Sequence, residues 1–211
     1  KDTSFDMKEF KKYTGNIKAI KSRYRLNNNK PIWGILSHIN WDCVSDYSPM
    51  IYDSFNEWIL ETIKIIEKVS EVQWLIKVHP AEAWDNPDTG TEALIKNKIG
   101  TLPANIRLIS AYEEISPLDF FGLVDGAVTV YGTSGLELSL LGKPVILAGD
   151  AHYGNKGFTY DAKDAIEYKN LLQQAEKLSQ LSEKEIETAQ KYAYCYFLQR
   201  QIPVSVVENP H

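Results

Sequence analysis

Short apolar runs alternate with segments of helical periodicity along most of this chain. Five runs show the continuous hydrophobic pattern of buried strands, over residues 31–37, 72–78, 105–110, 126–130 and 145–148. Helices are predicted around them, over residues 7–23, 54–69, 91–98, 116–123, 136–141, 162–178 and 182–197. This alternation predicts the α/β class: a parallel sheet with helices on both faces, in a single Rossmann-like domain.

Several predicted helix ends carry residues that favour a cap. Ser54 and Ser182 each precede a glutamate by three residues, which is the spacing of a capping box. Ser116 suits an N-cap before Pro117, and Gly142 suits the position just after a helix. On the last helix the inward face is expected to carry Ile186, Ala189, Tyr192, Ala193, Tyr196 and Phe197. The core is expected to contain Trp33, Trp58 and Trp74.

The organisation read from the pattern is one domain with two flanking pieces. Residues 1–30 are predicted to be a lead-in helix and linker, residues 31–203 the Rossmann-like domain, and residues 204–211 a short tail. Because the chain begins with Lys1 rather than Met, we expect a fragment or a processed chain.

Composition narrows the class of protein without identifying it. The 211 residues are 44% hydrophobic and 24% charged, as in an ordinary globular protein. The formal net charge of −5 argues against a nucleic-acid-binding protein, which usually carries a basic surplus. Cys43 and Cys195 lie far apart and outside any metal-binding spacing, which favours a reducing compartment. No signal peptide and no apolar run of membrane-spanning length is visible.

The stretch from residue 129 to residue 149 is the strongest candidate for a ligand site. A buried strand ends in a small-residue turn, Gly132 to Gly135, which opens a short helix. The backbone of such a turn allows close approach, and the positive end of a helix favours an anion. Many α/β turns bind nothing, so a plain connecting turn is the alternative. Neither G-x-G-x-x-G nor a Walker sequence is present.

Further polar residues follow the other predicted strands, so the topology should gather them at one edge of the sheet. The candidates for binding substrate are Asn40, Ser110, Gly132, Thr133, Ser134, Glu137, Asp150 and Lys156. The candidates for catalysis are His79, Asp42 and Glu82. No metal site is predicted, since there is no D-x-D motif.

Each of these residues also has a structural explanation. His79 either contacts a phosphate or takes part in acid–base chemistry, or it is simply hydrogen-bonded at a strand end. Asp42 is a catalytic or sugar-binding carboxylate, or makes an Asx turn. Glu137 accepts from ribose hydroxyls, or forms a capping box with Ser134. For Lys156 the two alternatives are a lysine that neutralises a diphosphate and a loop lysine that is only solvated.

Several short motifs together resemble the bacterial capsule polysaccharide biosynthesis proteins, relatives of the Kdo transferases and of surface-carbohydrate glycosyltransferases with the GT-B fold. The resemblance covers roughly residues 33–161. It is carried, in order, by Asn-Trp-Asp at 40–42, Trp-Ile-Leu-Glu-Thr at 58–62, Lys-Val-His-Pro-Ala-Glu at 77–82, Tyr-Gly-Thr-Ser-Gly-Leu-Glu at 131–137, Gly-Lys-Pro-Val-Ile at 142–146 and Tyr-Gly-Asn-Lys-Gly-Phe-Thr at 153–159.

The resemblance implies the C-terminal, donor-binding half of a GT-B glycosyltransferase that uses a nucleotide sugar and needs no metal or other cofactor. Carried over from related transferases, the pairs His79-Pro80 and Thr133-Ser134 would hold the nucleotide phosphate, and Glu137 would bind ribose or orient the donor. The turn is Gly-Thr-Ser-Gly here rather than a Ser-Ser pair, which leaves the donor open.

The implied partners are the N-terminal GT-B domain and a polysaccharide or lipid-linked acceptor. The base would come from that domain or from the Asn40 loop, so we expect the chain alone to bind nucleotide but to turn over little or no sugar. The location implied is the cytoplasm, with peripheral membrane association of the full-length protein left open. The alternatives are a glycerophosphotransferase of the teichoic-acid type and a non-catalytic Rossmann-like binding module.

Overall fold

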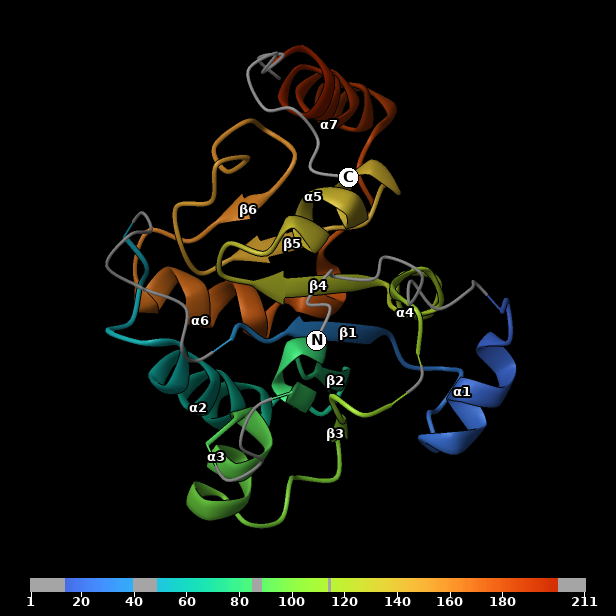
Figure 1. Cartoon of the computed structure of the whole chain (residues 1–211), viewed down its shortest axis with the longest axis vertical. Helices are drawn as coiled ribbons and strands as arrows, with labels where there is room; N and C mark the ends of the chain where they lie inside the picture. Colours follow the sequence, from blue (N-terminus) through green and yellow to red (C-terminus); the bar gives the residue numbers. More distant parts are fainter. Residues whose placement is uncertain (1–13, 40–48, 85–88, 114, 201–211) are drawn as a thin grey trace, which may run out of the picture.

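The structure is a computed structural model, and it describes residues 14–39, 49–84, 89–113 and 115–200. Six parallel strands form one sheet in the order β3-β2-β1-β4-β5-β6, with β1 at Ile32–Leu36, β2 at Gln73–Lys77, β3 at Ile106–Ile109, β4 at Gly126–Thr129, β5 at Val145–Leu147 and β6 at Tyr160–Asp161. Figure 1 shows this order from β6 near the top of the view to β3 near the bottom. The predicted α/β class and the five predicted strands are confirmed.

Helices pack on both faces of the sheet. The α-helices are α1 (Ile17–Arg23), α2 (Phe55–Ile66), α3 (Thr91–Lys98), α4 (Pro117–Leu123), α5 (Thr133–Leu140), α6 (Ala165–Gln173) and α7 (Glu183–Tyr194). Short 3-10 turns lie at Pro80–Trp84 and Ala175–Lys177, and a π-helical turn, Cys195–Gln199, follows α7. Buried residues of α4, α5 and α7 share one hydrophobic cluster, and those of α2, α3 and α6 share the other.

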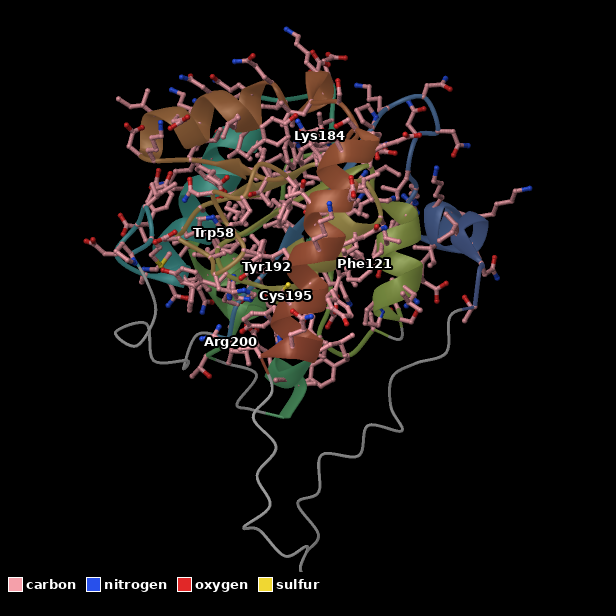
Figure 2. All side chains as sticks on the ribbon, turned by 90° about the horizontal axis from the view of Figure 1, so that it is seen from above. Trp58, Phe121, Lys184, Tyr192, Cys195 and Arg200 are labelled. Carbon is pink, nitrogen blue, oxygen red and sulfur yellow. The ribbon has the colours of Figure 1, made fainter. Side chains whose placement is uncertain are left out.

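The two clusters give the domain a core on each side of the sheet. Trp58 of α2 and Phe121 of α4 lie on opposite sides in Figure 2, and both are buried. The predicted core tryptophans Trp33, Trp58 and Trp74 are almost fully enclosed. Trp58 donates its indole N–H to the Tyr168 hydroxyl over 2.9 Å, which links α2 to α6 within the apolar core.

The lead-in segment packs against the domain from residue 14 onward. Side chains of Ile17 and Ile20 contact the α4 side of the core, and the backbone N–H of Gly15 donates to Asp119 over 3.0 Å. The helix predicted over residues 7–23 begins at Ile17, because the Asn16 side chain caps it by accepting from Ala19 N–H. The first half of that prediction lies outside the described residues.

Other differences from the predicted elements have local causes. The helix predicted over 162–178 begins at Ala165, because Asp164 accepts from two backbone N–H groups as its N-cap. The short edge strand β6 falls in a segment predicted to be loop, since two residues give too short a pattern to detect. Phe197, expected to face inward, is 40% exposed because the chain widens into the π-helical turn there.

The helix starts predicted at Ser54, Ser116 and Ser182 are confirmed, although the capping box predicted at Ser54 is incomplete. Ser182 and Glu185 form a full capping box, and Ser116 with Pro117 begins α4. Ser54 caps α2, although the Glu57 carboxylate accepts from the N–H of Asp53 rather than from that of Ser54.

In the described ranges, no helix has the length and apolar character needed to cross a membrane.

Candidate anion-binding site

The predicted site residues follow the carboxyl ends of strands β1 to β5. Because all strands are parallel, these ends lie along one edge of the sheet. In the register of β1 and β2, Leu36 pairs with Lys77, so His38 and His79 each stand two residues beyond a matched pair. Neighbouring strands are about 4.8 Å apart, which brings the two histidines beside one another.

The turn after β4 leads directly into α5 without a side-chain cap. Gly132 is the N-cap of the helix, and a glycine has no side chain with which to cap it. The first amide groups of a helix have no carbonyl one turn before them, so those of Thr133 and Ser134 are left to bind an external acceptor. The Thr133 side chain is exposed and that of Ser134 is partly exposed.

The helix α5 ends just before Gly142, as the sequence predicted. Gly142 has φ +77° and donates to the Ser139 carbonyl over 3.0 Å, and Lys143 N–H donates to the Leu138 carbonyl over 3.0 Å. These two bonds form a Schellman motif. The helix α5 is therefore fixed at its far end, which holds the direction of its positive N-terminus.

The capping box predicted for Ser134 and Glu137 is wrong. The helix begins two residues earlier than that box requires, with Gly132 as N-cap, so Ser134 lies within the first turn. Burial raises the pKa of Glu137 above its ordinary value, and a hydrogen bond from the Ser134 side chain works against that rise. Neighbouring atoms shield the Glu137 carboxyl in part, but the residue still reaches the solvent beside the turn, as a ligand-contacting role requires.

Tyr153 supports the turn from the protein interior. Its buried hydroxyl donates to the Gly132 carbonyl over 2.6 Å. Burial, together with the Asp161 and Glu137 carboxylates, raises the pKa of Tyr153 far above its usual range, so the hydroxyl keeps its proton. A Cβ at Gly135 would lie 3.0 Å from the Tyr153 Cζ, which explains why a glycine is needed there.

His38 is a residue of this site that the sequence analysis did not single out. Its Nε2 lies 3.1 Å from the Thr129 hydroxyl oxygen and accepts from the N–H groups of Val130, at 3.2 Å, and Tyr131, at 3.3 Å. Its ring stacks on Phe55 with centroids 4.5 Å apart. Burial and the neighbouring His79 lower the pKa of His38 to about 4, so the ring is neutral near pH 7.

Two hydrogen bonds hold His79, one to the residue that follows β1 and one from the turn that follows His79 itself. Its N–H donates to the Ser37 hydroxyl oxygen over 2.9 Å, and its Nδ1 accepts from Ala81 N–H over 3.2 Å. An accepting Nδ1 requires that Nε2 carry the proton of the neutral ring, so Nε2 is a donor. Pro80 begins the 3-10 turn that provides the Ala81 amide.

Glu82 has a clear structural task in the fold. Its buried carboxylate accepts from the Thr91 N–H over 2.7 Å and from the Thr91 hydroxyl over 2.6 Å. These bonds satisfy the N-terminus of α3, whose N-cap is Gly90 and has no side chain. The catalytic role stays a prediction for Glu82, and its geometry favours the cap.

Ser110 lies at the same edge but away from the turn. Its hydroxyl donates to the Glu92 carboxylate over 2.6 Å, which ties the end of β3 to α3. In the strand order β3 is three places from β4, or about 14 Å. The structure therefore groups Ser110 with Glu92 rather than with Thr133 and Ser134.

The loop after β5 carries Asp150 and Lys156, both exposed. Asp150 donates its N–H to the Pro49 carbonyl over 2.9 Å, and its carboxylate acts with burial to raise the pKa of Tyr131, so it lies beside the turn. Lys156 lies near His152: burial, then the charges of Arg200 and Lys156, lower the pKa of that imidazole. Figure 2 shows Arg200 at the end of the π-helical turn that follows α7.

Two predicted residues, Asn40 and Asp42, lie outside the described residues, so their roles stay predictions. Among the residues that the structure describes, no group of three or more His, Cys, Asp or Glu side chains is placed to hold a metal ion. Among the described residues, the candidate site consists of the turn from Tyr131 to Ser134, with His38 and His79 beside it.

Comparison with known proteins finds solved structures that share this fold. Thermosulfurimonas dismutans KpsC, a beta Kdo 2,4 transferase, is 19% identical with a TM-score of 0.50, over 79% of this chain and 46% of that one. Anabaena HepE, solved with UDP and glucose, is 16% identical with a TM-score of 0.53, over 92% of this chain and 51% of that one.

A Neisseria meningitidis UDP-GlcNAc 2-epimerase bound to UDP-GlcNAc is 14% identical with a TM-score of 0.53, over 83% of this chain and 42% of that one. At these identities the likeness shows the shared fold, and the chain spans about half the length of each structure. A search of curated proteins found no significant match. The model of the capsule polysaccharide biosynthesis protein family matches residues 4–197. The resemblance expected from the sequence motifs is confirmed: the chain belongs to the capsule polysaccharide biosynthesis protein family.

Proposed function

We propose that this chain binds the phosphate of a nucleotide sugar at the N-terminus of α5, and that the whole protein is a glycosyltransferase of capsule or surface polysaccharide synthesis. The observation that carries the proposal is the uncapped start of α5, where Gly132 leaves the amides of Thr133 and Ser134 without side-chain competition. A helix N-terminus attracts anions through these amides and through its dipole.

The position of His79 supports a phosphate rather than a neutral ligand. The strands β2 and β4 are two places apart in the sheet, or about 10 Å. A phosphate with one hydrogen bond on each side spans about 8 Å, which suits a group held between the His79 Nε2–H and the α5 amides. The His79 ring and the α5 amides would both donate hydrogen bonds to the phosphate, and neither carries a negative charge.

This arrangement fits the chemistry of glycosyl transfer. As the bond between sugar and phosphate breaks, negative charge grows on the departing phosphate. Donors that are already fixed stabilise that charge without having to reorganise. In this proposal the α5 amides and His79 do this work without a divalent metal, and Glu137 or Asp150 contacts the sugar or the ribose.

The remaining parts of the reaction are assigned to groups beyond this site. Asp42, or a residue of the second GT-B domain, would deprotonate the acceptor hydroxyl. That domain and a polysaccharide or lipid-linked acceptor would complete the cleft. The similarity to HepE, whose structure holds UDP and glucose, supports a nucleotide-sugar donor through the shared fold.

A thermal-shift screen against CMP, CDP, UDP, GDP and ADP tests the proposal. At about one hundred times its dissociation constant a nucleotide stabilises the folded chain by about 2.7 kcal/mol, which corresponds to a rise of about 5 °C or more in Tm. CMP would indicate a CMP-linked acidic sugar, CDP a glycerol phosphate donor, and UDP or GDP a hexose donor.

Variants place the ligand. His79→Ala, and Thr133→Pro, which removes one donor amide at the first helical position, where proline is tolerated, should each reduce the shift, whereas Lys169→Ala, an exposed change on α6, should leave it intact. A shift that survives both site variants would contradict the proposed site. Absence of any shift, in this chain and in the full-length protein, would favour the non-catalytic binding module.

A further inference from the structure

The hydrogen bonds of the turn after β4 can be followed one amide at a time. The N–H groups of Val130 and Tyr131 both point to His38 Nε2, at 3.2 Å and 3.3 Å. The Gly132 N–H donates to the Thr129 hydroxyl oxygen over 3.3 Å, and Gly135 N–H donates to the Gly132 carbonyl over 2.9 Å. Four of the six amides from residue 130 to residue 135 are therefore directed into the protein.

The two amides that remain are those of Thr133 and Ser134. We propose that His38 is the positioning residue of this turn: its neutral imidazole accepts from the N–H groups of Val130 and Tyr131 and thereby turns those of Thr133 and Ser134 toward the anion. The inference rests on the proposed function, because it names what aims the donors of that same site. His38 itself does not contact the ligand in this proposal.

The tautomer of His38 follows from the same contacts. Backbone N–H groups only donate, so Nε2 must offer a lone pair to Val130 and Tyr131, and the ring proton must lie on Nδ1. The Thr129 hydroxyl, 3.1 Å from Nε2, can then donate to it while accepting from Gly132 N–H. One ring nitrogen thus orders three consecutive amides, directly or through Thr129.

The charge of this acceptor matters as much as its position. A carboxylate beneath the turn could accept the same amides, but its negative charge would repel an anion held above them. A protonated imidazole would carry a hydrogen on Nε2, so the Val130 and Tyr131 N–H groups would lose their acceptor. The apolar neighbours Phe55 and Trp58, whose rings lie 4.5 Å and 5.9 Å from that of His38, favour the neutral form.

A series of substitutions at residue 38 separates the effect of the acceptor's position from the effect of its charge. His38→Gln keeps an uncharged acceptor near the place of Nε2, His38→Glu gives that acceptor a negative charge, and His38→Leu removes it. We expect His38→Gln to bind CMP, CDP or UDP within about threefold of the unaltered chain, and the other two to bind about tenfold more weakly or worse. Ile63→Ala, in the α2 core, is the matched control: it should lower Tm without changing the dissociation constants.

Equal binding by His38→Leu and the unaltered chain would overturn the proposal, as would equal weakening by His38→Gln and His38→Leu at matched Tm. Two measurements on the ligand-free chain keep the test separate from that of nucleotide binding. Nitrogen-15 NMR should show His38 protonated at Nδ1 and bare at Nε2. Amide hydrogen exchange at Val130 and Tyr131 should accelerate in His38→Leu and stay slow in His38→Gln. A protonated Nε2 or unchanged exchange would refute the positioning role even if no nucleotide binds.

Discussion

Asp119 lies at the start of α4 and joins it to the segment that precedes α1. Its carboxylate accepts from the Ser116 hydroxyl over 2.7 Å, from Thr14 N–H over 3.1 Å and from Gly15 N–H over 3.0 Å. Burial alone would raise the pKa of Asp119, but these hydrogen bonds outweigh burial and hold the pKa below its ordinary value. The charged form of this one side chain therefore fixes two segments that are about a hundred residues apart in sequence.

We predict that Asp119→Asn lowers the free energy of unfolding by about 1–3 kcal/mol near neutral pH, because an amide N–H would face the donors of Thr14 or Gly15. Since the folded pKa is below the unfolded one, this stabilisation is present above about pH 4 and is lost as the pH falls through the folded pKa. Urea unfolding at several pH values should show that the free energies of unfolding of the two proteins approach each other in acid. Glu176→Gln, an exposed change outside α4, is the control, and a pH-independent difference would contradict the prediction.

The two histidines show how far single residues could be predicted. His79 attracts notice in the sequence because Pro80 follows it, whereas the motif that follows His38, Asn-Trp-Asp at 40–42, draws attention away from the histidine itself. Both stand two residues beyond paired strand ends, so a rule based on strand ends alone would have found His38 as well. Its acceptor role depends on β4, which is about ninety residues away, and no local pattern carries that information.

At the scale of elements, the ends of helices and strands were predictable where a single local interaction decides them. The caps at Ser116 and Ser182 and the stop at Gly142 depend on neighbours within a few residues. The start of α5 depends instead on a tertiary contact: Tyr153 bonds the Gly132 carbonyl and packs where Gly135 leaves room. The sequence signal of Ser134 and Glu137 therefore placed the cap two residues too late.

The fit between Gly135 and Tyr153 gives a prediction for that element. A Cβ at residue 135 would overlap the Tyr153 hydroxyl and lie 3.0 Å from its Cζ and 3.2 Å from the Thr129 Cγ2. Gly135→Ala should therefore cost about 1–3 kcal/mol of stability, although alanine is the better helix former. Denaturant unfolding measures this cost.

A double-mutant cycle identifies the cause. Tyr153→Phe removes the hydroxyl that a Cβ would meet, at the cost of its hydrogen bond to Gly132, so Gly135→Ala should cost less in the Tyr153→Phe background. Strictly additive costs would show that the overlap with Tyr153 is not what excludes a side chain at residue 135.

At the scale of the whole molecule, the two edges of the sheet differ in how their loops are arranged. The amino edge is closed by bonds between loops: Asn27 N–H donates to the Gln73 side chain over 2.6 Å, Lys30 to the Ser70 carbonyl over 2.8 Å, and Gln180 to the Asp125 carbonyl over 2.9 Å. The carboxyl edge carries His38, His79 and the start of α5. Parallel topology was predictable from the alternation of elements, and it fixes which edge holds the site.

This difference predicts where a ligand alters the chain. If the nucleotide found in the thermal-shift screen binds at the carboxyl edge, hydrogen exchange monitored by mass spectrometry should slow in peptides that contain residues 130–136 and 77–82, because bound amides exchange only when they open. Peptides from the amino edge, over residues 27–31, 70–73 and 179–182, are the internal reference and should not change. In His79→Ala, at a nucleotide concentration that restores occupancy, the slowing should persist at 130–136 and weaken at 77–82. Slowing confined to the amino edge would place the ligand elsewhere and would contradict the site built here from the α5 turn and the two histidines.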